Sequence, residues 1–256
     1  MIAVIAEPIL RVAGLSAVFP NGNGGLHVLD QISFDVRESE FVCLLGPSGS
    51  GKSTLLRILA GLLDYQEGEV ILDGALLHGP RPGVGMVFQK ANLMPWRTVR
   101  ENIFLPLELQ GTPEAQAEET IQELIDLVGL TGFEDSLPRD LSGGMAQRVA
   151  IARALVHDPD MLLLDEPFGA LDALTRERMA GELLRIWNAR CKTVFMVTHD
   201  IGEAIFLSDR VLAFSERPAR LTLDLEVDLP RPRSLEMRYT PEFGRMAMAL
   251  RHAIGR

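Results

Sequence analysis

Three short, unbroken runs of apolar residues occur along the chain, at 41–45, 161–164 and 193–197. Runs of this length without polar alternation are typical of strands in parallel sheets, where helices cover both faces. Between the second and third runs, apolar residues recur at the spacing of one helix face, as a crossover helix between parallel strands requires. These residues are Met179, Leu183, Ile186 and Trp187. The pattern predicts an α/β fold with a mostly parallel sheet.

The N-terminal part of the chain has a different pattern. The runs 15–19 and 32–36 flank a turn-rich stretch at 20–25, and the second run alternates apolar and polar residues. Alternation is typical of strands with one solvated face, and the glycines and asparagines between the runs favour a turn. We therefore expect an antiparallel β subdomain here.

Strand patterns disappear between about residues 90 and 158, and helical spacing replaces them. Thr112 and Pro113 predict a helix start, with the threonine as the capping hydroxyl and the proline in the first helical position. Gly129 predicts its end. The apolar face between these signals consists of Ile121, Leu124, Ile125 and Val128. This region is expected to be an inserted α-helical subdomain.

The composition is that of an ordinary globular protein. Of 256 residues, 47% are hydrophobic and 23% charged, which excludes a disordered, collagen-like or coiled-coil chain. The net charge of −10 argues against a broad nucleic-acid-binding face, which needs clustered lysines and arginines. Cys43 and Cys191 lie in apolar runs, so we expect buried thiols and no disulfide. No apolar stretch approaches the ~20 residues of a membrane-spanning helix. Residues 1–6 lack the basic leading segment of a secretory signal.

A phosphate-binding loop follows the first apolar run directly. Its sequence is Gly46-Pro47-Ser48-Gly49-Ser50-Gly51-Lys52-Ser53-Thr54. This is a complete G-x-x-x-x-G-K-[ST] loop, and the flanking strand and helical pattern argue against a chance glycine-rich turn. The glycines let backbone amides turn toward phosphate oxygens at a helix N-terminus, where the helix dipole favours anions. Lys52 adds a positive charge for the outer phosphates, and Ser53 offers a hydroxyl to Mg²⁺.

Two acidic residues, Asp165 and Glu166, follow the second apolar run. Beside a phosphate loop, the first acid after such a strand belongs to the Mg²⁺ shell and the second can hold the attacking water. Without that loop, a surface turn would be the better interpretation. Lys52 and Asp165 lie much further apart than one strand–helix–strand unit requires, so the helical stretch is an insertion between them.

A second candidate anion site lies just before the acidic strand, in residues 141–148, Leu-Ser-Gly-Gly-Met-Ala-Gln-Arg. Ser142 can cap a helix that begins with Gly143 and Gly144, so that a hydroxyl and bare amides gather at one helix N-terminus. A chain with one nucleotide pocket has no obvious need of this second site.

Together these motifs resemble those of the ATP-binding subunits of ABC transporters, over nearly the whole chain. In chain order, the matching positions are the adenine-stacking aromatic at Phe19, the Walker A loop at 46–53, the Q-loop at Gln89, the signature motif at 141–148, Walker B at 162–166, the D-loop at 170–172 and the switch histidine at His199. Phe19 departs mildly from the family, which often has Tyr there. Several of these motifs, such as Gln89 and His199, would be weak signals alone, but the ordered series makes the resemblance specific.

The resemblance implies an ATPase with a P-loop NTPase core that works as a head-to-tail homodimer. Each of two ATP molecules would lie between the Walker A loop of one chain and Ser142, Gly143 and Gly144 of the other. Glu166 would act on the hydrolytic water, and His199 would contact the γ-phosphate. The groups serving Mg²⁺ would be Ser53, Gln89 and Asp165.

The resemblance also implies a partner in the membrane. The helical subdomain and the Gln89 region would grip an integral-membrane permease at the cytoplasmic face of the cell membrane, and the permease would work with a solute-binding protein. The implied division is a nucleotide-binding core at about 1–89 and 159–230, a helical signature subdomain at about 90–158, and a C-terminal tail and helix at 231–256. Residues 228–234, rich in proline and arginine, are expected to be a surface tail.

Within the family, residues 93–99 and Met145 resemble the importers of nitrate, sulfonate, taurine and related small compounds. Met94 and Trp96 have two interpretations: they pack the core of the helical subdomain, or they line a groove for a permease helix. A soluble ABC-type ATPase of iron–sulfur assembly, DNA repair or translation is the alternative function. A nucleotide sensor without turnover is a third, and the presence of both Glu166 and His199 argues against it. The sequence does not identify the solute.

Overall fold

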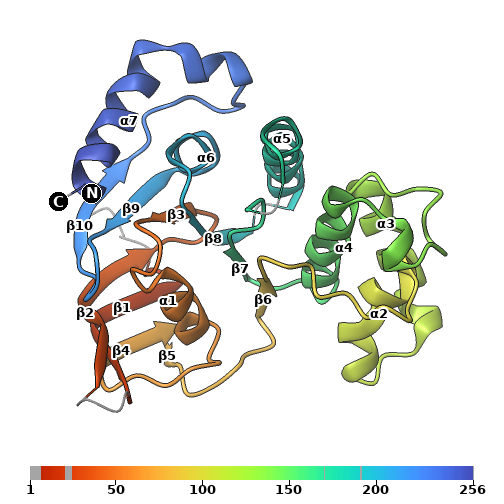
Figure 1. The fold of residues 1–256 in the computed structure, drawn as a ribbon. Coiled ribbons are helices and arrows are strands. Elements are labelled where there is room, and N and C mark those ends of the chain that lie inside the picture. Colours follow the sequence, from red (N-terminus) through yellow and green to blue (C-terminus); the bar gives the residue numbers. More distant parts are fainter. Residues whose placement is uncertain (1–6, 21–24, 170, 191, 256) are drawn as a thin grey trace, which may run out of the picture. The chain divides into compact units, whose positions relative to one another are not determined.

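The computed structural model describes residues 7–20, 25–169, 171–190 and 192–255. They form two compact units, which Figure 1 shows as ribbons. Unit 1 is built from the segments Met1–Arg81 and Thr193–Arg256, and unit 2 is the segment Pro82–Lys192.

Unit 1 contains an antiparallel sheet at the N-terminal end of the chain. Its strands have the order β2-β1-β4-β5. They are β1 (Leu10–Phe19), β2 (Leu26–Val36), β4 (Glu67–Leu72) and β5 (Ala75–Leu76). Leu10 and Val12 are buried while Arg11 between them is exposed, which is the alternation of a strand with one solvated face. The expected antiparallel strands are confirmed.

The other strands of unit 1 are mainly parallel. Here β3 (Phe41–Leu45) pairs in parallel with β8 (Thr193–Thr198) and β9 (Arg210–Phe214), and β10 (Leu221–Glu226) runs antiparallel to β9. Every residue of β3 and β8 is buried, as their unbroken apolar sequences predict.

Helices flank these parallel strands. They are α1 (Lys52–Leu59), α6 (Ile201–Leu207), the 3₁₀ turn η2 (Leu235–Tyr239) and α7 (Pro241–Ile254). Figure 1 shows α1 between the antiparallel sheet and β3, with α6 and α7 on the other side. Because α6 and α7 also contact each other, the C-terminal end of the chain packs onto the helix that follows β8.

Unit 2 consists of two parallel strands and a set of helices. The strands are β6 (Val84–Val87) and β7 (Met161–Asp165), and the helices are α2 (Val99–Leu109), α3 (Glu114–Leu127), the 3₁₀ turn η1 (Pro138–Asp140), α4 (Gly143–Leu155) and α5 (Ala173–Arg190). Residues 90–158, all of which are described, contain no strand, so the predicted helical stretch is confirmed. The apolar face predicted for α3 is buried, and α2 packs against both α3 and α4.

Two sequence predictions are wrong in detail. Thr112 does not cap α3: Pro113 occupies the N-cap position without a side-chain hydrogen bond, because the helix begins one residue later than predicted. Residues 228–234 are not a surface tail throughout, since the side chain of Arg233 is only 1% exposed. It donates hydrogen bonds to carbonyl groups at the end of α6, and these contacts hold the segment against that helix.

The remaining general predictions concern the cysteines and membrane-spanning segments. Cys43 is buried on β3, and burial raises the pKa of its thiol. Cys191, Ala170 and residues 1–6 lie outside the described residues. In the part of the chain that the structure describes, no helix has the length and apolar character needed to cross a membrane.

Candidate nucleotide-binding site

The phosphate loop connects β3 to α1 in unit 1. Gly49 and Gly51 have φ angles of 77° and 110°, in a region that side chains strongly disfavour. A β-carbon at Gly51 would also lie 2.7 Å from Val28 Cγ1, so glycine is required there. Gly51 is the N-cap of α1, and no side chain caps this helix end. Its first backbone amides, together with the helix dipole, therefore favour a bound anion.

Two side chains of the loop have hydrogen-bonding groups suited to phosphate. Lys52 is buried, and its Nζ donates to the carbonyl oxygens of Gly46 at 2.9 Å and Pro47 at 2.8 Å. Ser50 Oγ is also buried and has no hydrogen-bond partner among the residues that the structure describes. A buried hydroxyl without a partner is costly. A phosphate oxygen at the loop would satisfy it.

The other predicted residues of unit 1 lie in the loop, in the first turn of α1, or on the antiparallel sheet. Ser53 and Thr54 are half-buried in the first turn of α1, and Ser48 and Gly49 are exposed in the loop before it. Phe19 is half-buried at the end of β1, where it pairs with Leu26 of β2.

His199 leaves the sheet at the same edge as the phosphate loop. The parallel register of β3 and β8 pairs Leu45 with Thr198, so the residues that follow both strands emerge side by side. His199 is exposed, and Asp200 after it caps α6 by accepting a hydrogen bond from the Glu203 amide at 2.8 Å. The carboxyl ends of parallel strands are the usual place for a ligand in such folds.

In unit 2 the predicted Q-loop glutamine and the acidic pair also meet at one sheet edge. β6 and β7 pair in parallel, with Val87 opposite Leu164. Asp165 is the buried last residue of β7, and Glu166 after it has a φ of 43°. A β-carbon at Gly169 would lie 3.2 Å from Gln89 Nε2 and 3.3 Å from Glu166 Oε2, so these side chains lie beside the same glycine. Amide and carboxylate oxygens are ligands that Mg²⁺ favours.

The signature residues lie at the N-terminus of α4. Ser142 is the N-cap and accepts a hydrogen bond from the Met145 amide, as predicted. Ser142 and Gly143 are exposed, whereas Gly144 is buried, and a β-carbon there would lie 3.5 Å from Thr175. The start of α4 therefore packs against α5 on one side and presents a hydroxyl and bare amides on the other.

The described part of the D-loop caps the next helix. Asp172 Oδ1 accepts a hydrogen bond from the Thr175 amide at 3.1 Å. The hydrogen bonds with Thr175 lower the pKa of the Asp172 carboxyl group. This carboxylate is therefore ionised near neutral pH at the start of α5, where the helix dipole favours negative charge.

Two residues that sequence reasoning missed connect the Q-loop to α4. Gln147 is buried, and its Nε2 donates to the Phe88 carbonyl at 3.2 Å. The Arg153 guanidinium donates to the carbonyls of Ala91 and Asn92 at 2.7 and 3.0 Å. Burial lowers the pKa of Arg153. The signal in the sequence was that both are polar residues in a largely apolar helix, and that pattern does not identify their partners.

The strand–loop–helix with its phosphate loop and the parallel strands beside it define a P-loop nucleoside-triphosphatase fold. The sequence profile of the ABC transporter family matches residues 29–169. The chain is 47% identical to an aliphatic sulfonates import ATP-binding protein of Bacillus cereus, over 88% of each chain. It is 44% identical to a nitrate import ATP-binding protein of Synechocystis, over 91% of this chain and 90% of the relative.

A solved structure supports the same assignment. A dimeric ATP-binding cassette in a post-hydrolysis state, bound to ADP and phosphate, superposes with a TM-score of 0.75 at 31% identity, over 86% of this chain and all of that chain. The chain therefore belongs to the ABC transporter family, as an ATP-binding subunit that hydrolyses ATP.

Proposed function

We propose that this chain energises an importer of a small solute such as nitrate, a sulfonate or taurine, and that it acts as a homodimer at the cytoplasmic face of the cell membrane. Relatives that match nearly the full chain are import ATP-binding proteins for sulfonates and nitrate. The partners would be integral-membrane permease subunits and, through them, a solute-binding protein.

The observation that carries this proposal is the exposed N-terminus of α4. Ser142 and Gly143 present a hydroxyl and uncapped amides to the surface, which is the chemistry of an anion site. The phosphate loop already supplies one such site in the same chain. In a head-to-tail dimer, Ser142, Gly143 and Gly144 of one chain would bind the γ-phosphate of ATP held on the phosphate loop of the other. The dimeric form of the related cassette supports this arrangement.

Each predicted site residue has a role in this proposal. The loop from Gly46 to Thr54 would bind the phosphates, and Phe19 would stack on adenine. Ser53, Gln89 and Asp165 would hold Mg²⁺, and their hydroxyl, amide and carboxylate oxygens fit this hard cation. When bound, Mg²⁺ would neutralise negative charge on the phosphates. Glu166 would orient and deprotonate the water, and His199 would contact the γ-phosphate.

The two anion sites can be separated by mutation. Lys52→Ala removes the charge aimed at the phosphates, so the monomer should lose nucleotide affinity. Gly143→Asp places a negative charge where the partner chain's γ-phosphate would bind, so monomer affinity should remain and cooperative hydrolysis should be lost. Ser142→Arg, which blocks the same place by its bulk, should have the same effect.

Equilibrium nucleotide binding at low protein concentration and the dependence of ATPase rate on protein concentration measure the two effects. If Gly143→Asp and Lys52→Ala reduce monomer affinity equally, Ser142 belongs to the same chain's pocket and the head-to-tail arrangement is wrong.

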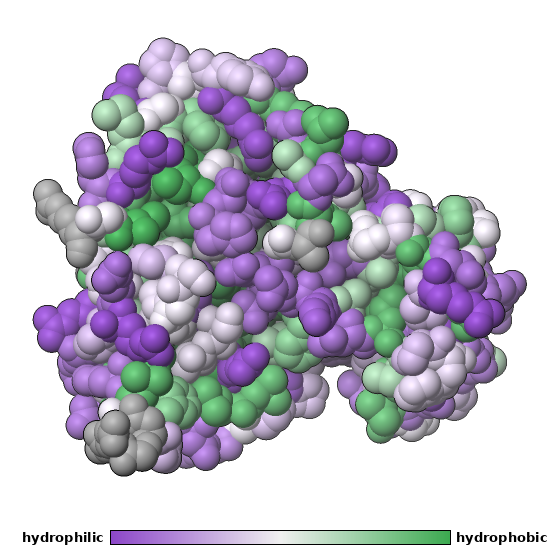
Figure 2. Space-filling model, viewed as in Figure 1, coloured by the Kyte–Doolittle hydropathy of each residue, from purple (hydrophilic) through white to green (hydrophobic). Residues whose placement is uncertain are grey.

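The proposed contact with a permease rests on the segment after Gln89. Trp96 is 73% exposed, which is unusual for a residue with so large an apolar surface. Figure 2 shows hydrophobic residues reaching the surface of the part formed by α2 to α4. Co-purification of a polytopic membrane protein with the tagged chain from detergent-solubilised membranes would support the transport role. If no membrane protein co-purifies, a soluble ABC ATPase is favoured instead.

A further inference from the structure

Three arginines that follow β10 hold α6 in place. Arg233 donates through Nη1 to the carbonyl oxygens of Ile205, Phe206 and Ser208, at 2.8, 3.1 and 2.6 Å. Arg231 Nη2 donates to the Leu207 carbonyl at 2.9 Å, and the Arg238 guanidinium lies 4.9 Å from the centre of the Phe206 ring. The last carbonyls of a helix have no partners within the helix, and the negative end of its dipole favours cations. The C-terminal segment thus supplies the cap that α6 lacks.

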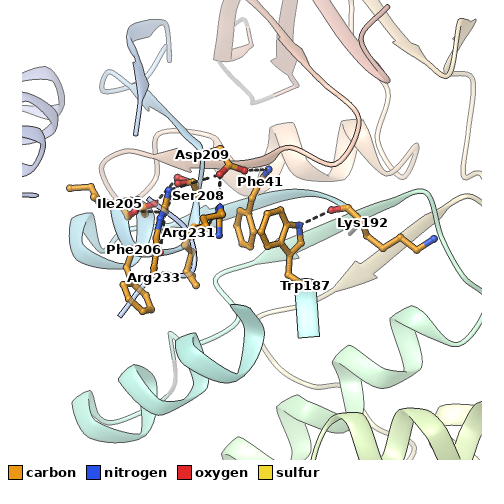
Figure 3. A network of polar contacts seen from close by, with 11 residues as sticks. Phe41, Trp187, Lys192, Ile205, Phe206, Ser208, Asp209, Arg231 and Arg233 are labelled. Carbon is orange, nitrogen blue, oxygen red and sulfur yellow. Dashed lines mark hydrogen bonds and ion pairs between the residues drawn. The ribbon is translucent and has the colours of Figure 1, made fainter. Parts of the chain in front are cut away.

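These contacts extend to the strand that carries the phosphate loop. Asp209 Oδ1 accepts a hydrogen bond from Arg231 Nε at 2.8 Å, and Asp209 Oδ2 accepts one from the Phe41 amide at 3.0 Å. Phe41 is the first residue of β3, whose other end leads into the phosphate loop. Figure 3 shows Arg231 and Arg233 converging on Ser208 and Asp209. Burial and the neighbouring Arg231 lower the pKa of Arg233 to about 10, so the guanidinium stays charged near neutral pH.

The other end of α6 is fixed to the strand before His199. Thr198 Oγ1 donates to Glu203 Oε2 at 2.7 Å, and both residues are buried. The Asp200 amide donates to Thr198 Oγ1 at 3.1 Å. With only seven residues, α6 spans roughly 10 Å between these contacts and those at its C-terminal end. A displacement of its C-terminal end would therefore be passed on to the backbone beside His199.

We infer that Arg233, assisted by Arg231, is a positioning residue for His199: by capping α6, the C-terminal segment sets where the switch histidine lies beside the phosphate loop. This inference rests on the proposed role of His199 in hydrolysis. The segment would then determine the turnover rate without contacting the nucleotide. Displacements of about 1 Å are enough to change rates on the order of a hundredfold.

A double-mutant cycle tests this inference. Arg233→Ala should lower kcat on the order of ten- to a hundredfold, with KM for ATP and equilibrium ATP affinity unchanged, because the phosphate loop keeps its own contacts. In a His199→Ala background, Arg233→Ala should cause no further fall in single-turnover rate, although it should lower the melting temperature by the same amount in both backgrounds. If Arg233 had a purely structural role, Arg233→Ala would lower the single-turnover rate by the same factor in the wild-type and His199→Ala backgrounds.

Matched variants complete the experiment. Arg245→Ala removes the same charge from α7, where Arg245 pairs with Glu242 one turn away on the exposed surface, and it should leave kcat unchanged. Arg233→Lys keeps the positive charge but has a single donor nitrogen in place of the planar guanidinium, so it should recover part of the rate. If Arg233→Ala does not fold, Arg231→Gln replaces it in the same cycle.

The outcomes separate this inference from the proposed function. If His199→Ala leaves hydrolysis unchanged, the proposed role of His199 fails. If His199→Ala slows hydrolysis while Arg233→Ala has no effect, or an effect equal in both backgrounds, the positioning role is wrong and the proposed function stands.

Discussion

At the scale of single residues, Glu166 has a backbone conformation that few side chains adopt. Its φ of 43° lies in the left-handed region, which costs a non-glycine residue on the order of 1–3 kcal/mol. Such strain persists where the surrounding structure imposes it, and it is concentrated at active sites. Here it places the carboxylate beside Gly169, together with Gln89.

Replacing the Glu166 carboxylate by an amide tests its role as the base. Glu166→Gln should still bind ATP but hydrolyse it on the order of 10²–10⁴ times more slowly, because the amide cannot accept a proton from water. The protein should then remain an ATP-bound dimer, visible by gel filtration with ATP, while phosphate release measures the rate. Glu118→Gln on the exposed surface of α3 is the matched control and should behave as wild type. Wild-type turnover in Glu166→Gln would mean that another group activates the water.

Gly169 offers a second test of the same site. A methyl group at Gly169 would lie 3.2 Å from Gln89 Nε2 and 3.3 Å from Glu166 Oε2, closer than most side-chain contacts. We expect Gly169→Ala to displace one or both side chains, so that kcat falls severalfold while ATP affinity is retained. Gly181→Ala, where a β-carbon meets open space on α5, is the control. Unchanged kcat in Gly169→Ala would show that the positions of Gln89 and Glu166 do not limit the rate.

The sequence predicted those site residues that belong to a short contiguous motif. The phosphate loop, the acidic pair and the Ser142 cap each depend on neighbours within a few positions, so the chain itself shows them. Gln147 and Arg153 could not be predicted, because their partners at residues 88–92 lie far away in sequence and become neighbours only when α4 packs beside β6.

At the scale of secondary-structure elements, two glycines differ in whether the structure has room for a larger residue. Gly181 lies inside α5 with open space at its β-position, whereas Gly68 in β4 has a φ of 91° and a β-carbon there would lie 2.5 Å from the Gly14 carbonyl oxygen. Gly181→Ala should therefore stabilise the protein by about 0.5–1 kcal/mol, through reduced backbone entropy of the unfolded chain. Thermal unfolding should show a rise in melting temperature of about 2 °C.

Gly68→Ala provides the opposite case. It should lower the melting temperature, because the strained backbone and the close carbonyl oxygen outweigh any entropic gain. A fall in melting temperature for Gly181→Ala would mean that the exposed face of α5 is covered in solution.

Among the parallel strands, those that the sequence pattern predicted are fully buried. β3, β7 and β8 have unbroken apolar sequences because helices cover both sides of them. The edge strand β10 was missed, since its residues alternate between half-buried and exposed and half of them are polar. The buried role of Arg233 was also missed, because proline and arginine in sequence are typical of solvated segments and only the position of α6 supplies acceptors for the guanidinium.

At the scale of the whole molecule, the predicted machinery is divided between the two units. Unit 1 carries the phosphate loop and His199, and unit 2 carries Gln89, Glu166 and the signature end of α4. Neither unit alone carries the complete set of predicted residues. The division into core, helical and C-terminal regions at residues 89, 158 and 230 remains a prediction.

Trp96 lies on a segment that is fixed by hydrogen bonds to the side chain of Asn102. The buried side chain of Asn102 bonds this segment, accepting from the Met94 amide at 2.8 Å and donating to the carbonyls of Met94, Arg97 and Thr98. Met94 is half-buried and Trp96 is 73% exposed, so the interpretation that both pack the core is wrong for the tryptophan. An exposed aromatic side chain on a rigid support binds a partner with little loss of conformational entropy.

This arrangement predicts that Trp96 contributes to permease binding and not to folding. Trp96→Ala should change the free energy of unfolding by no more than about 0.5 kcal/mol and leave ATP affinity intact, because little of its surface is buried in this chain. Met94→Glu should act likewise, with a somewhat larger loss of stability because Met94 is half-buried. In both variants the amount of co-purified membrane protein and the solute uptake should fall, and permease binding should weaken by about 2 kcal/mol, the loss expected at an aromatic hot spot.

Tyr239→Ala is the control: it removes an 87% exposed aromatic side chain from unit 1 and should leave permease binding unchanged. A lower melting temperature together with loss of ATP binding in Met94→Glu would assign Met94 to the core of unit 2. Full permease binding by a stable Trp96→Ala variant would place the docking surface elsewhere.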